Sequence, residues 1–193
     1  QMLDQVMDAF NIKADYDLNI MKQGQTLSDI TAMALKDIEK VIKEVCPHII
    51  LVHGDTTTTF AGALAAFYNQ VPIGHVEAGL RTYNKYSPFP EEINRSFVGI
   101  VADMHFAPTV RSKENLLSEG KEEGSIYVTG NTAIDALKTT VKEDFTHPVL
   151  EWAKGSRLVT LTAHRRENLG EPMRRMFCAI RRIIEKYDDV KLV

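Results

Sequence analysis

Apolar positions along the chain follow two spacings, one typical of amphipathic helices and one typical of short buried strands. Between Leu27 and Val45, apolar residues recur at helical spacing, which predicts a helix with one side facing a core. Between His48 and Val52 the apolar run is short, which predicts a buried strand. Thr26 or Ser28 would cap the 27–45 helix, and Pro47 would end it.

The two patterns alternate to the end of the chain. A first amphipathic helix is predicted around Leu3, Val6, Met7 and Phe10, and further helices at 57–68, 91–101, 110–118, 133–141 and 173–187. Further strands are predicted at 72–76, 104–107, 126–129, 157–162 and 190–193. Short strands separated by helices indicate βαβ units, and therefore an α/β fold with parallel sheets.

The stretch 143–156 interrupts this alternation with charged residues, a His147-Pro148 pair and Gly155. It is typical of a connection between two α/β units. In open parallel sheets, ligands bind outside the carboxyl ends of the strands. Functional residues are therefore expected directly after each strand.

Composition limits the class of protein. The chain has 193 residues, of which 44% are hydrophobic and 25% charged, and its net charge is -3. These values favour a globular protein and give no broad attraction to nucleic acid or to an anionic membrane. We find no signal peptide and no apolar run near the ~18 residues of a membrane span, so a cytoplasmic location is expected. Cys46 and Cys178 are expected to be reduced packing residues.

The first candidate cluster follows strand 48–52 and has the sequence His53-Gly54-Asp55 and then four threonines. Glycine permits a tight turn into a helix, whose free amides can receive an anion. Asp55 is either the N-cap of that helix or a group facing a ligand. One cap does not require four threonines, so several hydroxyls are expected to face a ligand.

The second cluster follows strand 72–76. Strand alternation places His75 and Glu77 on the same side, and the small residues around Glu77 leave room for a substrate. The alternative is an ion pair between Glu77 and Arg81.

A stiff, proline-rich loop, Ser87-Pro88-Phe89-Pro90, ends at the helix that starts with Glu91 and Glu92. These acids either stabilise the first helical turn or point one carboxylate into a cleft. After strand 157–162, His164, Arg165 and Arg166 form a cationic group suited to a diphosphate, the alternative being a charged surface turn.

Several kinds of site find no support in the sequence. The remaining histidines lack metal-ligand spacing, so no metal site is expected. Neither a dinucleotide fingerprint nor a P-loop is present, so no redox cofactor and no ATP hydrolysis are predicted.

Five motifs taken together resemble the bacterial non-hydrolysing UDP-N-acetylglucosamine 2-epimerases. They are the segments 53–58, 74–82, 87–95, 128–135 and 162–167, and they cover the chain in order. The resemblance implies two Rossmann-like domains in the GT-B architecture, with the active site in the cleft between them. It places the hinge near Gly130 and Asn131, giving an N-terminal domain at 1–130 and, at 131–193, a hinge helix and the start of a UDP-binding domain.

The resemblance also implies an activity. Members interconvert UDP-N-acetylglucosamine and UDP-N-acetylmannosamine for cell-surface polysaccharides such as teichoic acid, without a cofactor. UDP is eliminated across C1 and C2 of the sugar, and it adds back as C2 is reprotonated on the opposite face.

Family motifs assign roles to particular positions. Asp55, Glu77 and Glu91 match functional carboxylates, His164 matches a histidine that stabilises or protonates the departing diphosphate, and Arg165 counters its charge. Arg81 and Thr57 are expected to bind substrate. Which carboxylate takes the C2 proton stays open.

Some relatives bind a second UDP-N-acetylglucosamine as an effector. Gln1, Glu91 and Arg165 match positions implicated there, whereas Gly24 stands where such relatives usually have arginine. The resemblance further suggests a homodimer.

Members of the family begin with a strand and a Gly-Thr-Arg-Pro-Glu type of loop, and the chain is expected to lack both, together with most of the C-terminal domain. By itself it is therefore expected to be weakly active or inactive. The alternative functions are a GT-B glycosyltransferase, a hydrolysing epimerase relative and a silent sugar-nucleotide-binding module.

Overall fold

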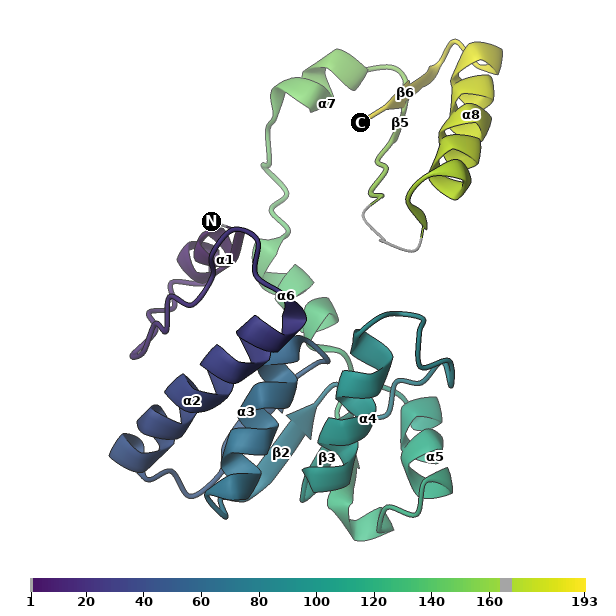
Figure 1. Ribbon diagram of the computed structural model, residues 1–193. Coiled ribbons are helices and arrows are strands. Elements are labelled where there is room, and N and C mark those ends of the chain that lie inside the picture. Colours follow the sequence, from purple (N-terminus) through teal and green to yellow (C-terminus); the bar gives the residue numbers. More distant parts are fainter. Residues whose placement is uncertain (1, 164–167) are drawn as a thin grey trace. The chain divides into compact units, whose positions relative to one another are not determined.

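The computed structural model describes residues 2–163 and 168–193. The chain divides into two compact units, Gln1–Thr140 and Val141–Val193 (Figure 1). The boundary lies later than the Gly130–Asn131 hinge that the family resemblance implies, because helix α6 (Thr132–Thr140) groups with the first unit. All strand pairs in the described residues are parallel, which confirms the predicted α/β class.

The first unit contains a parallel sheet whose strands lie in chain order. The strands are β1 (Ile50–His53), β2 (Ile73–Val76), β3 (Met104–Ala107) and β4 (Ile126–Val128). Helices α3 (Thr57–Tyr68), α4 (Glu91–Val101) and α5 (Val110–Ser118) connect them, and a short helix, η1 (Glu123–Ser125), precedes β4. Crossovers of this kind are right-handed and here all advance in one direction, so the three connecting helices cover the same face (Figure 1).

The two faces of this sheet differ in burial. On the face covered by helices, four residues lie side by side in register and form a buried row: Val52, His75, His105 and Ile126. On the opposite face, Leu51 and Tyr127 are 61% and 47% exposed. The core of the unit therefore lies between the sheet and α3, α4 and α5, and two imidazoles form part of it.

Helix α2 (Leu27–Val45) packs against α3. Its N-cap is Thr26, whose hydroxyl accepts from the amide of Asp29 at 3.1 Å while the Asp29 carboxylate accepts from the Thr26 amide at 2.9 Å. Ala34 and Ala61 are fully buried between the two helices, because small side chains allow a close approach. The first element of the chain is α1 (Met2–Ala9).

The described residues of the second unit contain a βαβ arrangement. Strands β5 (Arg157–Val159) and β6 (Val190–Leu192) pair in parallel and are joined by α8 (Glu171–Lys186). Arg157 binds both carboxylate oxygens of Asp189 at 2.7 Å, which ties the start of β5 to the start of β6.

Helix α7 (Pro148–Ala153) was not predicted, because the stretch 143–156 lacks a helical apolar pattern. Its start is set locally: Pro148 occupies the first turn, and Nδ1 of His147 accepts from the amide of Val149 at 3.2 Å. The prediction of packed cysteines is wrong in this structure. Cys46 and Cys178 are free thiols, as expected, but both are exposed, and Cys46 takes the left-handed position that ends α2.

The two buried histidines predict how stability depends on pH. Loss of hydration lowers the pKa of both His75 and His105 from 6.5 to about 4, and the positive charge of Arg81 adds to the effect. Between these values the unfolded chain binds more protons than the folded chain. The free energy of unfolding should therefore be highest above pH 6.5 and fall as the pH drops toward 4, with a slope from His75 of up to about 1.4 kcal/mol per pH unit.

Urea unfolding of the chain at several pH values measures this slope. His105→Met should make it shallower, because one of the two buried imidazoles is removed. His48→Gln removes an exposed histidine and should leave the slope unchanged. Equal slopes in the chain and in H105M would contradict the prediction.

Candidate active site

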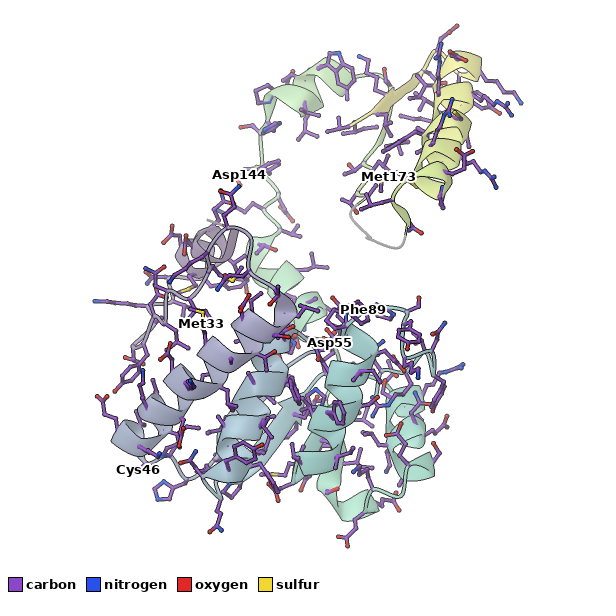
Figure 2. The ribbon with its side chains drawn as sticks, in the orientation of Figure 1. Met33, Cys46, Asp55, Phe89, Asp144 and Met173 are labelled. Atoms are coloured by element: carbon purple, nitrogen blue, oxygen red, sulfur yellow. The ribbon has the colours of Figure 1, made fainter. Side chains whose placement is uncertain are left out.

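Acidic and polar side chains gather at the carboxyl edge of the first unit's sheet. Asp55 follows β1 and Glu77 follows β2, and the two strands are neighbours. Because parallel strands end at the same edge, both residues lie where α3 and α4 begin. Figure 2 shows Asp55 at that end of the unit.

The turn at Gly54 and Asp55 is fixed by hydrogen bonds. Gly54 has a positive φ of 71°, which favours glycine, and its amide donates to the carbonyl of Val76 on β2 at 3.0 Å. The N-cap of α3 is Thr56, whose hydroxyl accepts from the amide of Thr59 at 3.2 Å. Asp55 is therefore not the cap of α3.

Two side chains of α4 contact Asp55. Nδ2 of Asn94 donates to the Asp55 carbonyl at 2.9 Å, and Nη1 of Arg95 lies 3.3 Å from its carboxylate oxygen Oδ2. The Arg95 side chain is only 8% exposed and the Asp55 side chain 26%. Helix α4 thus positions both the backbone and the carboxylate of Asp55.

Arg95 is itself held by Glu92, one turn earlier on the same helix. Its Nε and Nη2 donate to Oε2 of Glu92 at 2.8 and 2.5 Å. The same carboxylate accepts from the amides of Thr82 and Tyr83, at 3.0 and 2.8 Å. Burial alone would raise the pKa of Glu92, but these amides and the guanidinium outweigh it and hold the pKa below its usual value.

The two acids at the start of α4 differ in burial. Glu92 is buried and stabilises the loop after β2, whereas Glu91 is half-buried as the first residue of the helix. The two acids therefore differ in burial and in partners, and the predicted role of Glu91 in a cleft stays a prediction. Glu91 is the acid that the stiff loop leaves partly accessible.

Glu77 takes a left-handed conformation, with φ of 66°, directly after the end of β2. Strand alternation therefore does not extend from His75 to Glu77. Oε2 of Glu77 lies 3.9 Å from Nε2 of His53, and a Cβ added to Gly54 would lie 3.4 Å from the same oxygen. The Glu77 carboxylate is thus beside the turn that presents Asp55.

Arg81 is not part of this group of side chains. Its guanidinium donates to both carboxylate oxygens of Glu119 on the α5 side, at 2.6 and 2.7 Å, and to the Leu80 carbonyl at 2.8 Å. Only 2% of its side chain is exposed. The position gives no support to a substrate-binding role, and the ion pair of Arg81 forms with Glu119 rather than with Glu77.

The threonines after Asp55 divide between structure and surface. Thr59 is buried, and its hydroxyl donates to the His53 carbonyl at 2.7 Å, whereas the cap residue Thr56 is exposed. Thr57 is half-buried at the first position of α3, beside the amides of the helix N-terminus. Such a terminus suits an anionic group.

Three predicted site residues, Gln1, His164 and Arg165, lie outside the described residues. In the part of the chain that the structure describes, no group of three or more His, Cys, Asp or Glu side chains is arranged to hold a metal ion. No described helix is long and apolar enough to cross a membrane.

Sequence reasoning assigned no role to Asn94 or Arg95, and it did not foresee that Glu92 pairs with Arg95. The available signal was their spacing: positions 92 and 95 share a helix face, and an Arg three residues after a Glu can pair with it. That signal does not say that the pair is buried or that it reaches Asp55.

The fold and the adjacent carboxylates define a parallel α/β protein with a candidate acid–base site. A family model described as UDP-N-acetylglucosamine 2-epimerase matches residues 1–193. The chain belongs to this family, as the sequence motifs predicted. It is 63% identical to the UDP-N-acetylglucosamine 2-epimerase of Bacillus subtilis over 193 residues, which is 100% of this chain and 51% of that protein.

Solved structures agree. The Staphylococcus aureus MnaA–UDP co-structure matches 98% of this chain and 50% of its own, with a TM-score of 0.93 and 55% identity. The Neisseria meningitidis UDP-GlcNAc 2-epimerase bound to UDP-GlcNAc matches 100% of this chain and 55% of its own, with a TM-score of 0.90 and 46% identity. The chain thus spans about half the length of the relatives it matches, and it corresponds to half of a GT-B-like epimerase structure.

Glu92→Gln should destabilise the first unit much more than Glu91→Gln. The first change leaves the buried guanidinium of Arg95 without its main counter-charge, at a cost of about 3 kcal/mol. The second removes a charge from a half-buried helix start and should cost well under about 1 kcal/mol. Urea unfolding of both variants provides the comparison, and similar losses in the two would show that the Glu92 cluster does not hold the site together.

Proposed function

We propose that the whole protein interconverts UDP-N-acetylglucosamine and UDP-N-acetylmannosamine at C2 by eliminating and re-adding UDP. The observation that supports this most directly is the convergence of Asp55 and Glu77 at adjacent strand ends, in a chain of the 2-epimerase family. Solved relatives hold UDP or UDP-GlcNAc, so a nucleoside diphosphate sugar is the proposed ligand here too.

The reaction needs acid–base groups beside a diphosphate site. A base removes the poorly acidic C2 proton, the C–H electron pair becomes the C1=C2 bond, and the C1–O bond breaks with its electrons leaving on UDP. UDP then adds back to C1 while C2 takes a proton on the opposite face. Inversion requires proton transfer on two faces, which is the reason for more than one carboxylate.

In this proposal Asp55, Glu77 and Glu91 supply the acid–base groups. Asp55 and Glu77 are neighbours at the sheet edge, and Glu91 starts α4 from the loop beside them. His164 and Arg165 are proposed to bind the departing diphosphate, and Thr57 to contribute at the α3 N-terminus. Arg81 has no part in it, because Glu119 occupies its guanidinium.

Further parts of the proposal concern the protein's context. The product would enter cell-surface polysaccharide synthesis, the protein would form a homodimer, and a second UDP-N-acetylglucosamine would bind near Gln1, Glu91 and Arg165. Gly24 limits the effector proposal: its φ of 80° suits glycine, so the arginine usual in relatives would be strained in this turn.

Asp55→Asn or Glu77→Gln in the whole protein should lower kcat for UDP-N-acetylmannosamine formation by a factor of about 100 or more, because general acid–base catalysis supplies roughly that much. Asp37→Asn removes a carboxylate from α2, where it pairs with Lys40, and serves as the matched control. Rates near wild type in D55N and E77Q would rule out the assigned roles.

Analysis of the sugar product identifies the reaction class. Formation of UDP-N-acetylmannosamine supports the proposal, whereas free N-acetylmannosamine would identify a hydrolysing relative. Sugar transferred to an acceptor would identify a glycosyltransferase. Binding of UDP without any turnover would identify a sugar-nucleotide-binding module.

A further inference from the structure

The Cα atom of Asp55 lies between two peptide groups whose carbonyl oxygens both accept hydrogen bonds from side chains of other elements. The Gly54 carbonyl is 2.8 Å from Nε2 of His75 on β2. The Asp55 carbonyl accepts from Nδ2 of Asn94 on α4 at 2.9 Å. A side chain thus restrains the backbone on each side of the Asp55 carboxylate.

Peptide planarity makes these two bonds effective. The Gly54 carbonyl belongs to the same rigid plane as the Asp55 amide, and the Asp55 carbonyl belongs to the plane of the next amide. Fixing both carbonyls leaves the two torsions at Asp55 little freedom. The direction of its side chain toward a substrate is thereby set by β2 and α4.

His75 links the Gly54 carbonyl to an inner strand of the sheet. Its side chain is fully buried, and its strand pairs with β1 on one side and β3 on the other. The Gly54 amide also bonds β2, through the Val76 carbonyl at 3.0 Å. The peptide groups on both sides of Gly54 are therefore hydrogen-bonded to β2, the strand that Glu77 directly follows.

Burying His75 costs free energy, because only one of its two ring nitrogens is hydrogen-bonded within the described part of the chain. The bond from Nε2 to the Gly54 carbonyl explains why a histidine occupies this position. A carbonyl oxygen only accepts, so Nε2 of His75 is the protonated nitrogen, and Nδ1 is a bare acceptor. Among the residues that the structure describes, that buried Nδ1 has no hydrogen-bond partner, and neither has Nδ1 of the neighbouring His105. An apolar side chain would pack in this row without such a penalty, but it would leave the Gly54 carbonyl unbonded.

We propose that His75 is a positioning residue for the reaction: its Nε2–H holds the Gly54–Asp55 peptide and so aims the Asp55 carboxylate. This inference rests on the proposed function in assigning Asp55 a chemical role. His75 itself is buried and does not touch the substrate.

The test compares three variants of the whole protein. His75→Met removes the donor and keeps an apolar side chain of similar length, whereas His75→Gln keeps an N–H near the place of Nε2. His105→Met changes the adjacent residue of the same buried row, one strand farther from Asp55, and is the matched control. Turnover is divided by the number of molecules that bind UDP, so that loss of folded protein does not count.

H75M should lose kcat by about tenfold to a hundredfold with a smaller change in KM, since misplacement of a catalytic group by about 1 Å costs this much. H75Q should recover most of kcat, and H105M should stay within about threefold of the wild type. Equal losses in H75M and H105M, or no recovery in H75Q, would overturn the proposal and leave His75 a packing residue.

Amide hydrogen exchange separates this inference from the proposed function. In the 193-residue chain, H75M should speed exchange in the segment 54–59, and H105M should not. One outcome is that the wild-type protein fails to epimerise while amide exchange at 54–59 is still faster in H75M and unchanged in H105M. In that case the proposed function is wrong, but His75 does restrain the Asp55 backbone. If amide exchange at 54–59 is unchanged in H75M, then His75 does not restrain the Asp55 backbone, whatever the epimerase activity.

Discussion

The buried ion pair between Arg95 and Glu92 is the interaction on which the candidate site depends most. Each charge alone would be costly inside the protein, and each is satisfied by the other and by further groups. The Glu92 carboxylate accepts hydrogen bonds from two backbone amides of the loop after β2. Arg95 forms an ion pair with the Asp55 carboxylate, which follows β1. One pair on α4 thus joins the two loops that present the candidate carboxylates.

A buried pair of this kind adds little net stability compared with well-packed apolar side chains. What it adds is geometry, because a guanidinium has fixed N–H directions and binds carboxylates at few angles. Arg95 uses one edge for Glu92 and another nitrogen for Asp55. The position of the Asp55 carboxylate is therefore coupled to the loop after β2, and through that loop to the start of α4.

Most elements of the first unit could be predicted from sequence, because their signals are local. Apolar periodicity and the Thr26 cap predict α2, which matches its predicted range. Helix α3 also matches its predicted range, although its cap is Thr56 and not Asp55. Side-chain pairings were harder, because partners distant in sequence decide them. A cation after a strand end looks like a ligand-binding group, yet Glu119, 38 residues later, binds Arg81. Glu91 and Glu92 look equivalent until the amides of Thr82 and Tyr83 select one of them.

Arg95 and His75 both restrain Asp55, but Arg95 is charged and His75 is neutral. This difference has a chemical consequence. Positive charge beside a carboxylate favours its ionised form and weakens it as a base. Arg95 already supplies one such charge, at 3.3 Å. His75 fixes the adjacent backbone while remaining neutral, because burial lowers its pKa to about 4. A lysine or arginine there would hold the same carbonyl but would add a second cation near Asp55 and Glu77. A buried neutral imidazole supplies the hydrogen bond to the Gly54 carbonyl without adding that charge.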